Sequence, residues 1–319
     1  MTIEDEYLSR LAAAFRESHD FGFYESVICL GYVGSHSHGT YVPPSDPDAI
    51  DDVDLMGVLV PPRRYTIGLS TFEHWTLQRD ELDVVCYDFR KFVRLLLKGN
   101  PNVLGLLWLR DEDYLVRTKA FEMLQAERHL FAAKSVYASF AGYASGQLHR
   151  MTAYSPEIQK EIDALQSSLE AAGWHLQDVM DNRSVPMPKG ITHDEANAKA
   201  SRLRHLRAKY HAAYMGEKRR GLVVKHGYDT KNAAHLIRLL LMCGEFLETG
   251  DLNVYRTHDA SMLMAIKRGE WALEDVKARA ELLFADVKVK RDASGLPDEP
   301  DFAAISEIVE EITLDALTG

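Results

Sequence analysis

The chain has 319 residues, a hydrophobic content of 46% and a formal net charge of −11. This composition is typical of a soluble globular protein with a sizeable core, and no stretch is long and apolar enough to predict a membrane span. The acidic balance argues against broad, sequence-independent nucleic-acid binding, which relies on basic surface, although it permits a local basic groove. The acidic N-terminus lacks the layout of a signal peptide, and the three cysteines are scattered in apolar surroundings. We therefore expect a cytoplasmic protein without a disulfide or zinc framework.

The N-terminal third of the chain alternates helical and strand patterns. Apolar residues at helical spacing predict an amphipathic helix over residues 3–19. Short apolar runs bounded by turn residues predict core strands at residues 27–33, 55–60 and 82–87. Residues 67–78 are compatible with an added edge hairpin. A helix is expected over 89–97, followed by a short helix that Asn100 caps.

From about residue 118 the strand signals vanish and long helical patterns take over. Helices are expected at roughly 118–128, 135–152, 156–179, 194–219, 229–248, 258–267, 270–294 and 301–317. We therefore predict an α+β fold, with a small mixed-sheet catalytic domain over residues 1–117 followed by an all-helical domain over 118–319. Binding sites commonly lie in the cleft between such parts.

The stretch from Gly34 to Asp54 combines residue types that suit phosphate and metal binding. Gly34-Ser35 directly follows an apolar strand; glycine allows close backbone approach to a phosphate, and a helix that opens at Ser35 would aim N–H groups at it. Asp52 and Asp54 stand one residue apart at the head of the next strand, so their side chains point the same way. Asp83, on a neighbouring strand, can complete a cluster of three. Carboxylate oxygens suit Mg²⁺ or Mn²⁺, which would activate an attacking hydroxyl and neutralise a leaving pyrophosphate.

These aspartates also allow two other interpretations. By themselves, Asp52 and Asp54 also fit a cap or loop pair in solvent, and that alternative stays open. Asp46 and Asp48 form a second Asp-x-Asp pair. We reject this second register because Pro47 cannot donate to a sheet ladder, whereas Asp54 leads straight into an apolar strand.

Four segments in order carry a resemblance to a known family. They are Gly34-Ser35 with Gly39-Thr40, then Asp52 to Pro62, then Asp83 to Phe92 leading to Asn100-Pro101-Asn102, and finally Gly227 to Lys231 with His235 to Leu240. In this order they resemble the DNA polymerase beta superfamily of nucleotidyltransferases, and more narrowly its RNA-repair-pathway, RNA-ligase-associated branch. The resemblance implies metal-dependent transfer of a nucleoside monophosphate. It also implies nucleotide binding by Gly34, Ser35, Gly39 and Thr40.

Two departures from the family pattern are visible. The stretch between Ser35 and Asp52 is longer than this branch leads us to expect, and the extra residues fall within Pro43–Ile50. Gly105 stands where the family usually shows an acidic residue. Any contact that such an acidic side chain makes is therefore not expected here.

Other polar residues are candidates for nucleotide contact. Lys231, His235 and Arg238 are spaced i, i+4, i+7 and share one helical face. The resemblance implies that this face closes over the nucleotide, with Lys231 and Arg238 near phosphates; a solvated polar stripe is the alternative. His36 and His38 flank the Gly-Ser turn, where we expect a hydrogen-bonding role rather than a zinc site.

The densest positive region lies in the helical half. It comprises Arg202, Arg204, His205, Arg207, Lys209 and His211, with Lys218-Arg219-Arg220 and Lys225-His226 beyond. This cluster is compatible with a groove for RNA or for a triphosphate. A solvated helix face, with its charge balanced by nearby acidic residues, is the alternative that we favour.

We therefore expect a metal-dependent nucleotidyltransferase that moves a nucleoside monophosphate from a nucleoside triphosphate to an acceptor hydroxyl, with RNA ends such as those of tRNA as candidate acceptors. The same chemistry directed at a protein side chain or a small molecule is one alternative. A catalytically silent nucleotide-binding protein is another, although the intact set Asp52, Asp54 and Asp83 argues against it.

Overall fold

The computed structural model describes residues 3–43, 45–46, 52–79, 82–152, 156–183, 185–209 and 217–318. Of the extra residues within Pro43–Ile50, only Pro43, Ser45 and Asp46 belong to the described part. The chain divides into two compact units, one formed by residues 1–144 with 234–319 and the other by residues 145–233. None of the described helices combines the length and apolarity that crossing a membrane requires.

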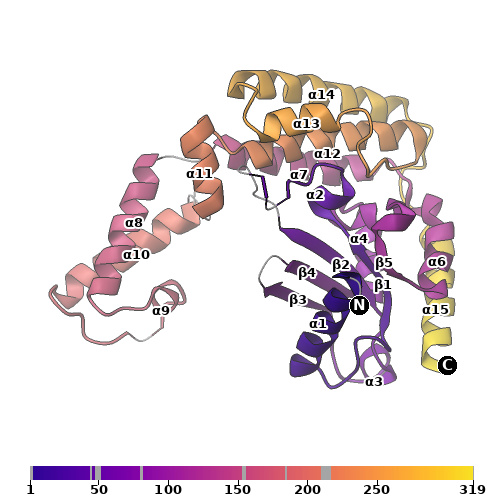
Figure 1. Ribbon diagram of the computed structural model, residues 1–319, viewed down its shortest axis with the longest axis horizontal. Coiled ribbons are helices and arrows are strands. Elements are labelled where there is room, and N and C mark those ends of the chain that lie inside the picture. The colour runs from indigo at the N-terminus through magenta and orange to yellow at the C-terminus, as the bar shows by residue number, and fades with distance from the viewer. Residues whose placement is uncertain are drawn as a thin grey trace. The chain divides into compact units, whose positions relative to one another are not determined.

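A mixed five-stranded sheet organises the first unit, in the order β3-β4-β2-β1-β5 (Figure 1). Its strands are β1 (Val27–Tyr32), β2 (Val53–Leu59), β3 (His74–Arg79), β4 (Leu82–Asp88) and β5 (Tyr114–Arg117). The central pair, β2 with β4, is parallel, and the other three pairs are antiparallel. After β5, every regular element among the described residues is helical. The predicted fold class is therefore confirmed.

The strands β3 and β5 lie at the two edges of the sheet. Of residues 67–78, where an edge hairpin was expected, only the part within β3 forms a strand, and its hairpin partner is β4; residues 67–73 contain no strand. The sequence did not predict β5, because four residues carry too little alternation to be recognised and its partner β1 lies far away in the chain.

One face of the sheet is covered by α1 (Ile3–Ser18). The fully buried ring of Phe15 meets Phe21, Phe23 and Trp75 edge-on, with ring centroids 5.1–5.6 Å apart. Burial of a side chain of this size stabilises the fold by roughly 2 kcal/mol. Because side chains alternate along a strand, the residues between those that face α1 point to the opposite face.

That opposite face carries α4 (Phe89–Leu97), which contacts β2 and β4. Asp88 caps α4 by accepting the Lys91 N–H at 3.0 Å. Asn100 caps the following α5 (Pro101–Leu104) by accepting the Asn102 N–H at 3.0 Å, as the sequence predicted. These two caps determine where the chain leaves the sheet and turns back over it.

The remaining elements of the first unit are helical. They are the 3₁₀ turns Gly105–Trp108, Asp111–Asp113 and Arg128–Phe131, and the helices α2 (Gly34–Ser37), α3 (Arg63–Thr66), α6 (Lys119–Ala126), α7 (Val136–Thr152), α12 (Thr230–Thr249), α13 (Ala260–Lys267), α14 (Leu273–Ala293) and α15 (Phe302–Thr318). Of these, α7 and α12 run on into the second unit. Lys290 of α14 pairs with Glu248 of α12 at 3.2 Å. These helices belong to the same compact unit as the sheet, so compactness divides the chain differently from the expected boundary at 117/118. The expected boundary follows the change from strand to helix, and the predicted division into domains stays a prediction.

The second unit is built on a helical hairpin. It contains α8 (Pro156–Ala171), α9 (Leu176–Met180), α10 (His193–Lys209) and α11 (Glu217–His226). Ile162 and Leu169 of α8 pack with Leu203 and Leu206 of α10. The expected single helix over 156–179 instead ends before Gly173, whose φ of 86° lies in the left-handed region that favours glycine.

Candidate functional site

The predicted Gly-Ser turn packs against Asp54. Gly34 opens the four-residue helix α2 (Gly34–Ser37) with a φ of 63°. A Cβ atom at this position would collide with the Asp54 carboxylate. The Val33 N–H donates to the backbone oxygen of Asp54 at 2.9 Å. Glycine is thus required here for close approach to a carboxylate of the neighbouring strand, whatever else it contacts.

Asp54 and Asp83 are direct neighbours across the parallel pair β2/β4. Adjacent strands lie about 4.8 Å apart, and register partners project from the same face. The Asp54 side chain is half-buried and that of Asp83 is exposed. Asp52 precedes β2 and is half-buried. The expected proximity of Asp54 and Asp83 is present in this register.

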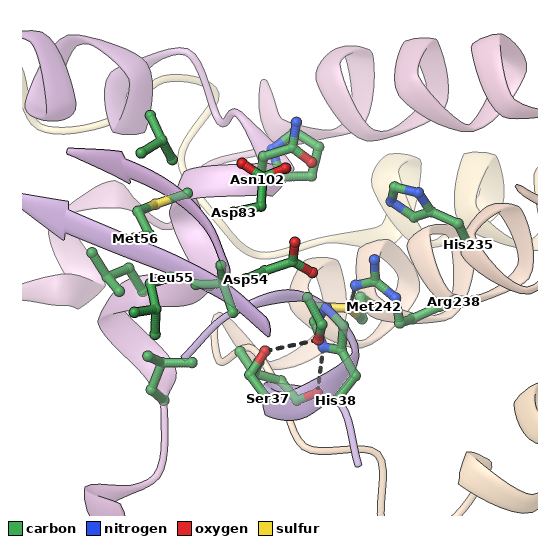
Figure 2. Close-up of a pocket in the computed structure, with 18 of the residues that line it drawn as sticks. Ser37, His38, Asp54, Leu55, Met56, Asp83, Asn102, His235, Arg238 and Met242 are labelled. Carbon is green, nitrogen blue, oxygen red and sulfur yellow. Dashed lines mark hydrogen bonds between the residues drawn. The ribbon is translucent and has the colours of Figure 1, made fainter. Parts of the chain in front are cut away.

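A pocket of about 400 Å³ opens over these two carboxylates. Figure 2 shows Asp54 and Asp83 projecting from the strands toward it. Val85 and Tyr87 continue the Asp83 face of β4 along its wall, and α5 supplies Asn102 opposite. Strand alternation would have identified Val85 and Tyr87 from the position of Asp83. By contrast, no local pattern indicated that α5 completes the wall.

Gly105 also lines this pocket. A Cβ atom there would meet the nearest atom, a Val254 methyl group, at 3.5 Å, which is an ordinary van der Waals contact. The departure from the family pattern at this position therefore leaves the pocket wider without being forced by crowding.

Arg238 of α12 lines the same pocket, together with His235 and Met242 (Figure 2). Its Nη1 donates to Met242 Sδ at 3.2 Å. Burial, followed by the positive charge of Arg256, lowers the pKa of Arg238 to about 9. No carboxylate forms an ion pair with Arg238 in the described parts of the chain. A guanidinium in such surroundings is costly unless an anion joins it.

His38, the residue that follows α2, is a further member of the lining. Its Nδ1 lies 3.0 Å from the backbone oxygen of Val254. Burial lowers the pKa of His38 well below its ordinary value, and the charges of Arg238, His235 and Arg256 add to that effect. Beside it, Ser37 Oγ donates to the Gly34 oxygen at 3.1 Å, which closes the turn on itself.

The other predicted residues of the turn contact the C-terminal part of the first unit. Gly39 has a φ of 69°, and a Cβ atom there would lie 2.8 Å from the Tyr255 ring. The buried Lys267 Nζ donates to the Thr40 oxygen at 2.7 Å, and the Thr40 N–H donates to the Ser35 oxygen at 3.0 Å. Ser35, Gly39 and Thr40 are absent from the pocket's described lining, as is Asp52.

Arg256 anchors this C-terminal contact. Its N–H donates to the His38 oxygen at 3.2 Å. Its guanidinium, 4% exposed, donates to Glu245 at 2.8 Å and to Asp259 at 2.9 Å. Charge-assisted, bidentate pairs of this kind are rigid. The turn that carries His38 is thus held from a distant part of the chain, and sequence reasoning offered no signal for it.

Lys231 lies in the first turn of α12 and belongs to the second unit, whereas His235 and Arg238 belong to the first. Asp229 caps this helix by accepting the Asn232 N–H at 3.0 Å. The pocket brings His235 and Arg238 together with the carboxylates. The role of Lys231 stays a prediction.

Much of the basic cluster is used inside the second unit. Arg202 pairs with Glu161 at 2.8 Å, Arg204 donates to the Val179 oxygen at 3.0 Å, and Arg207 donates to Gln166 at 3.0 Å. His211 lies outside the described residues, and the side chains of Lys209 and Lys218 to Arg220 are not described. These contacts favour a structural role for the three arginines.

No three His, Cys, Asp or Glu side chains of the described residues converge on a point that could hold a metal ion. The pair Asp54 and Asp83 nonetheless fits Mg²⁺. This ion keeps several waters and needs only one or two protein carboxylates when substrate phosphates complete its shell. The donor chemistry of the pocket therefore suits a metal that arrives with a nucleotide.

Comparison with known proteins agrees with this geometry. Residues 3–171 match the model of RlaP, described as the RNA repair pathway DNA polymerase beta family. Over 336 residues the chain is 22% identical to an uncharacterized 38.9 kDa protein from the nrdC-mobD intergenic region of Enterobacteria phage T4, with 90% of this chain and 97% of that protein covered. A crystal structure of a nucleotidyltransferase-like protein from Exiguobacterium sibiricum 255-15 is a structural neighbour at 9% sequence identity. The match covers 96% of this chain and 80% of the chain of that protein, and its TM-score of 0.26 is too low to carry an argument. The family match spans more than half of the 319 residues and includes Gly34, Asp54 and Asp83. The chain therefore belongs to the RNA repair pathway DNA polymerase beta family of nucleotidyltransferases.

Proposed function

We propose that this protein transfers a nucleoside monophosphate from a nucleoside triphosphate to an acceptor hydroxyl. The observation that carries the proposal is the pocket in which Arg238, without a carboxylate partner among the described residues, is combined with the neighbouring carboxylates Asp54 and Asp83. A metal–triphosphate complex has the complementary charges: cations for the aspartates and phosphate oxygens for the arginine.

The carboxylates are the proposed metal ligands. Asp54 and Asp83 would hold Mg²⁺ or Mn²⁺, and we propose Asp52 as the third catalytic carboxylate because it lies two residues before Asp54. The bound ion would supply Lewis-acid stabilisation of the phosphoryl group and of the leaving pyrophosphate. The protein contributes the positions of these side chains, which the β2/β4 register determines.

The nucleotide is proposed to lie against the turn and α12. Gly34 and Ser35 would contact it through the backbone, and Gly39 and Thr40 would support the turn through their contacts with Tyr255 and Lys267. Arg238 and His235 would face the phosphates from α12, with Lys231 at the start of that helix. A cationic partner is worth about 1.5–3 kcal/mol in a charge-assisted hydrogen bond to an anion.

We propose an RNA end, such as that of a tRNA, as the acceptor, because the family is associated with RNA repair. The test incubates the full chain with each α-³²P-labelled ribonucleoside triphosphate and Mg²⁺ or Mn²⁺, with and without RNA. Label that moves to RNA supports the proposal. Label that moves to protein would mean that the acceptor is a protein side chain instead of RNA. Binding of the triphosphate without any transfer would identify a catalytically silent nucleotide-binding protein.

The matched control for this assay is Asp46→Asn. Asp46 belongs to the rejected Asp-x-Asp register and pairs with Arg268 at 3.2 Å. We expect Asp46→Asn to retain transfer and Asp54→Asn to abolish it. The reverse result would overturn the assignment of the metal-binding aspartates.

A further inference from the structure

One ring nitrogen of His38 hydrogen-bonds to the backbone of the protein. The residue is 9% exposed, and its Nδ1 lies 3.0 Å from the Val254 backbone oxygen. A carbonyl oxygen can only accept a hydrogen bond, so Nδ1 carries the proton. In a neutral imidazole Nε2 is then a hydrogen-bond acceptor.

The surroundings of His38 keep the ring neutral. Burial lowers the pKa of His38 well below its ordinary value, and the positive charge of Arg238 lowers it further. Protonation of Nε2 would place a third positive charge beside Arg238 and Arg256. The fold therefore presents His38 as a neutral acceptor.

Nε2 is open to the pocket. Within the described residues it makes no hydrogen bond, and it is not one of the side-chain atoms that are both sealed from solvent and unpaired. His38 lines the pocket that also contains Asp54 and Arg238 (Figure 2). A ligand in this pocket meets an acceptor at His38 and a cation at Arg238.

We propose that His38 Nε2 accepts a hydrogen bond from a ribose hydroxyl of the bound nucleoside triphosphate and thereby recognises the sugar. This inference rests on the proposed function, because it assumes that the pocket binds a nucleotide. A phosphate oxygen cannot satisfy Nε2, since both atoms are acceptors. A sugar hydroxyl can donate, and in a nucleotide it is linked covalently to the phosphates that Arg238 would bind.

The test measures equilibrium binding to the full chain, by calorimetry with Mg²⁺ and without acceptor. The probes are the tightest-binding ribonucleoside triphosphate and its 2′-deoxy and 3′-deoxy forms. For the wild-type protein we expect one deoxy form to bind about 3- to 10-fold more weakly, the range of one neutral hydrogen bond. In His38→Asn the amide N–H can still donate to Val254, but nothing replaces Nε2, so all three nucleotides should bind equally.

A second variant separates positioning from packing. His38→Gln can direct an amide oxygen toward the position of Nε2, so it should recover part of the preference for the ribonucleotide. Melting temperatures of both variants show whether the turn remains folded.

Three results would overturn the inference: equal wild-type binding of all three sugars, equal weakening of all three by His38→Asn, or a change in base preference instead of sugar preference. Failure of every triphosphate to bind would instead overturn the proposed function. The two failures are therefore distinguishable.

Discussion

The half-buried position of Arg238 leads to an unusual prediction. Replacing this residue should stabilise the nucleotide-free protein and, at the same time, weaken its binding of nucleotide. The perturbation is Arg238→Met, which keeps the apolar stem of the side chain and its contact region beside Met242. Arginine remains charged at neutral pH. The fold therefore bears a cost for partly burying this cation, because no carboxylate among the described residues forms an ion pair with it and the more distant charge of Asp259 offsets only part of that cost.

The magnitude follows from the lowered pKa. A reduction from the ordinary value to about 9 corresponds to at most about 5 kcal/mol of penalty on the charged form, at ~1.4 kcal/mol per pH unit. Because the side chain is only half-buried and faces an open pocket, solvent screening reduces the expected gain for Arg238→Met to about 1–2 kcal/mol.

The lowered pKa of Arg238 also determines how the stability gained by Arg238→Met depends on pH. The folded-state pKa lies below the unfolded-state value, so folding releases a proton above pH 9 and the penalty is fully present below it. The stabilising effect of Arg238→Met should therefore be constant from pH 6 to 8 and shrink above about pH 9.

Two assays test this reasoning on the same variant. Denaturant unfolding should show a higher free energy of unfolding, and calorimetry should show triphosphate binding weakened about 10- to 100-fold, since a charge-assisted hydrogen bond is worth about 1.5–3 kcal/mol. The matched control is Arg256→Met. That arginine is paired with Glu245 and Asp259, and its loss leaves two carboxylates uncompensated, so about 3–5 kcal/mol of stability should be lost. If Arg256→Met does not fold, Arg256→Lys gives the milder comparison. The reasoning is refuted if Arg238→Met is destabilised like the control and binds triphosphate normally.

Three further predictions concern the carboxylates, the metal and α12. Asp54→Asn and Asp83→Asn should each abolish labelled nucleotide transfer while leaving the melting temperature unchanged or slightly raised, because like charges on neighbouring strands repel; retention of wild-type transfer by both would remove them from the active site. Triphosphate added with Mg²⁺ should raise the melting temperature well beyond either alone, since phosphates complete the metal shell; equal stabilisation by Mg²⁺ alone would indicate a structural ion site. Lys231→Ala should weaken triphosphate binding more than it lowers stability, and unchanged affinity would exclude Lys231 from the nucleotide site.

Much of the central sheet was predictable because its signals are local. The apolar runs that became β1, β2 and β4, and the cap at Asn100, follow from residue type and spacing within a few positions. Predicting that Asp54 and Asp83 lie close together required one more assumption, namely that their strands are neighbours. The parallel pairing of β2 with β4 confirms that assumption.

What the sequence by itself determined is therefore the set of elements and the residue chemistry each one carries, since hydrophobic periodicity, capping and side-chain alternation act over a few residues. Only the tertiary structure decided which of these residues meet. His38 is held by Val254 and Thr40 by Lys267, across more than 200 residues of chain. The same packing places the Arg238 guanidinium in the pocket without an ion-pair partner among the described residues. The Arg256 guanidinium, by contrast, is paired with Glu245 and Asp259. Burial and ion pairing depend on what the rest of the fold brings into contact, and no local pattern in the sequence encodes that choice.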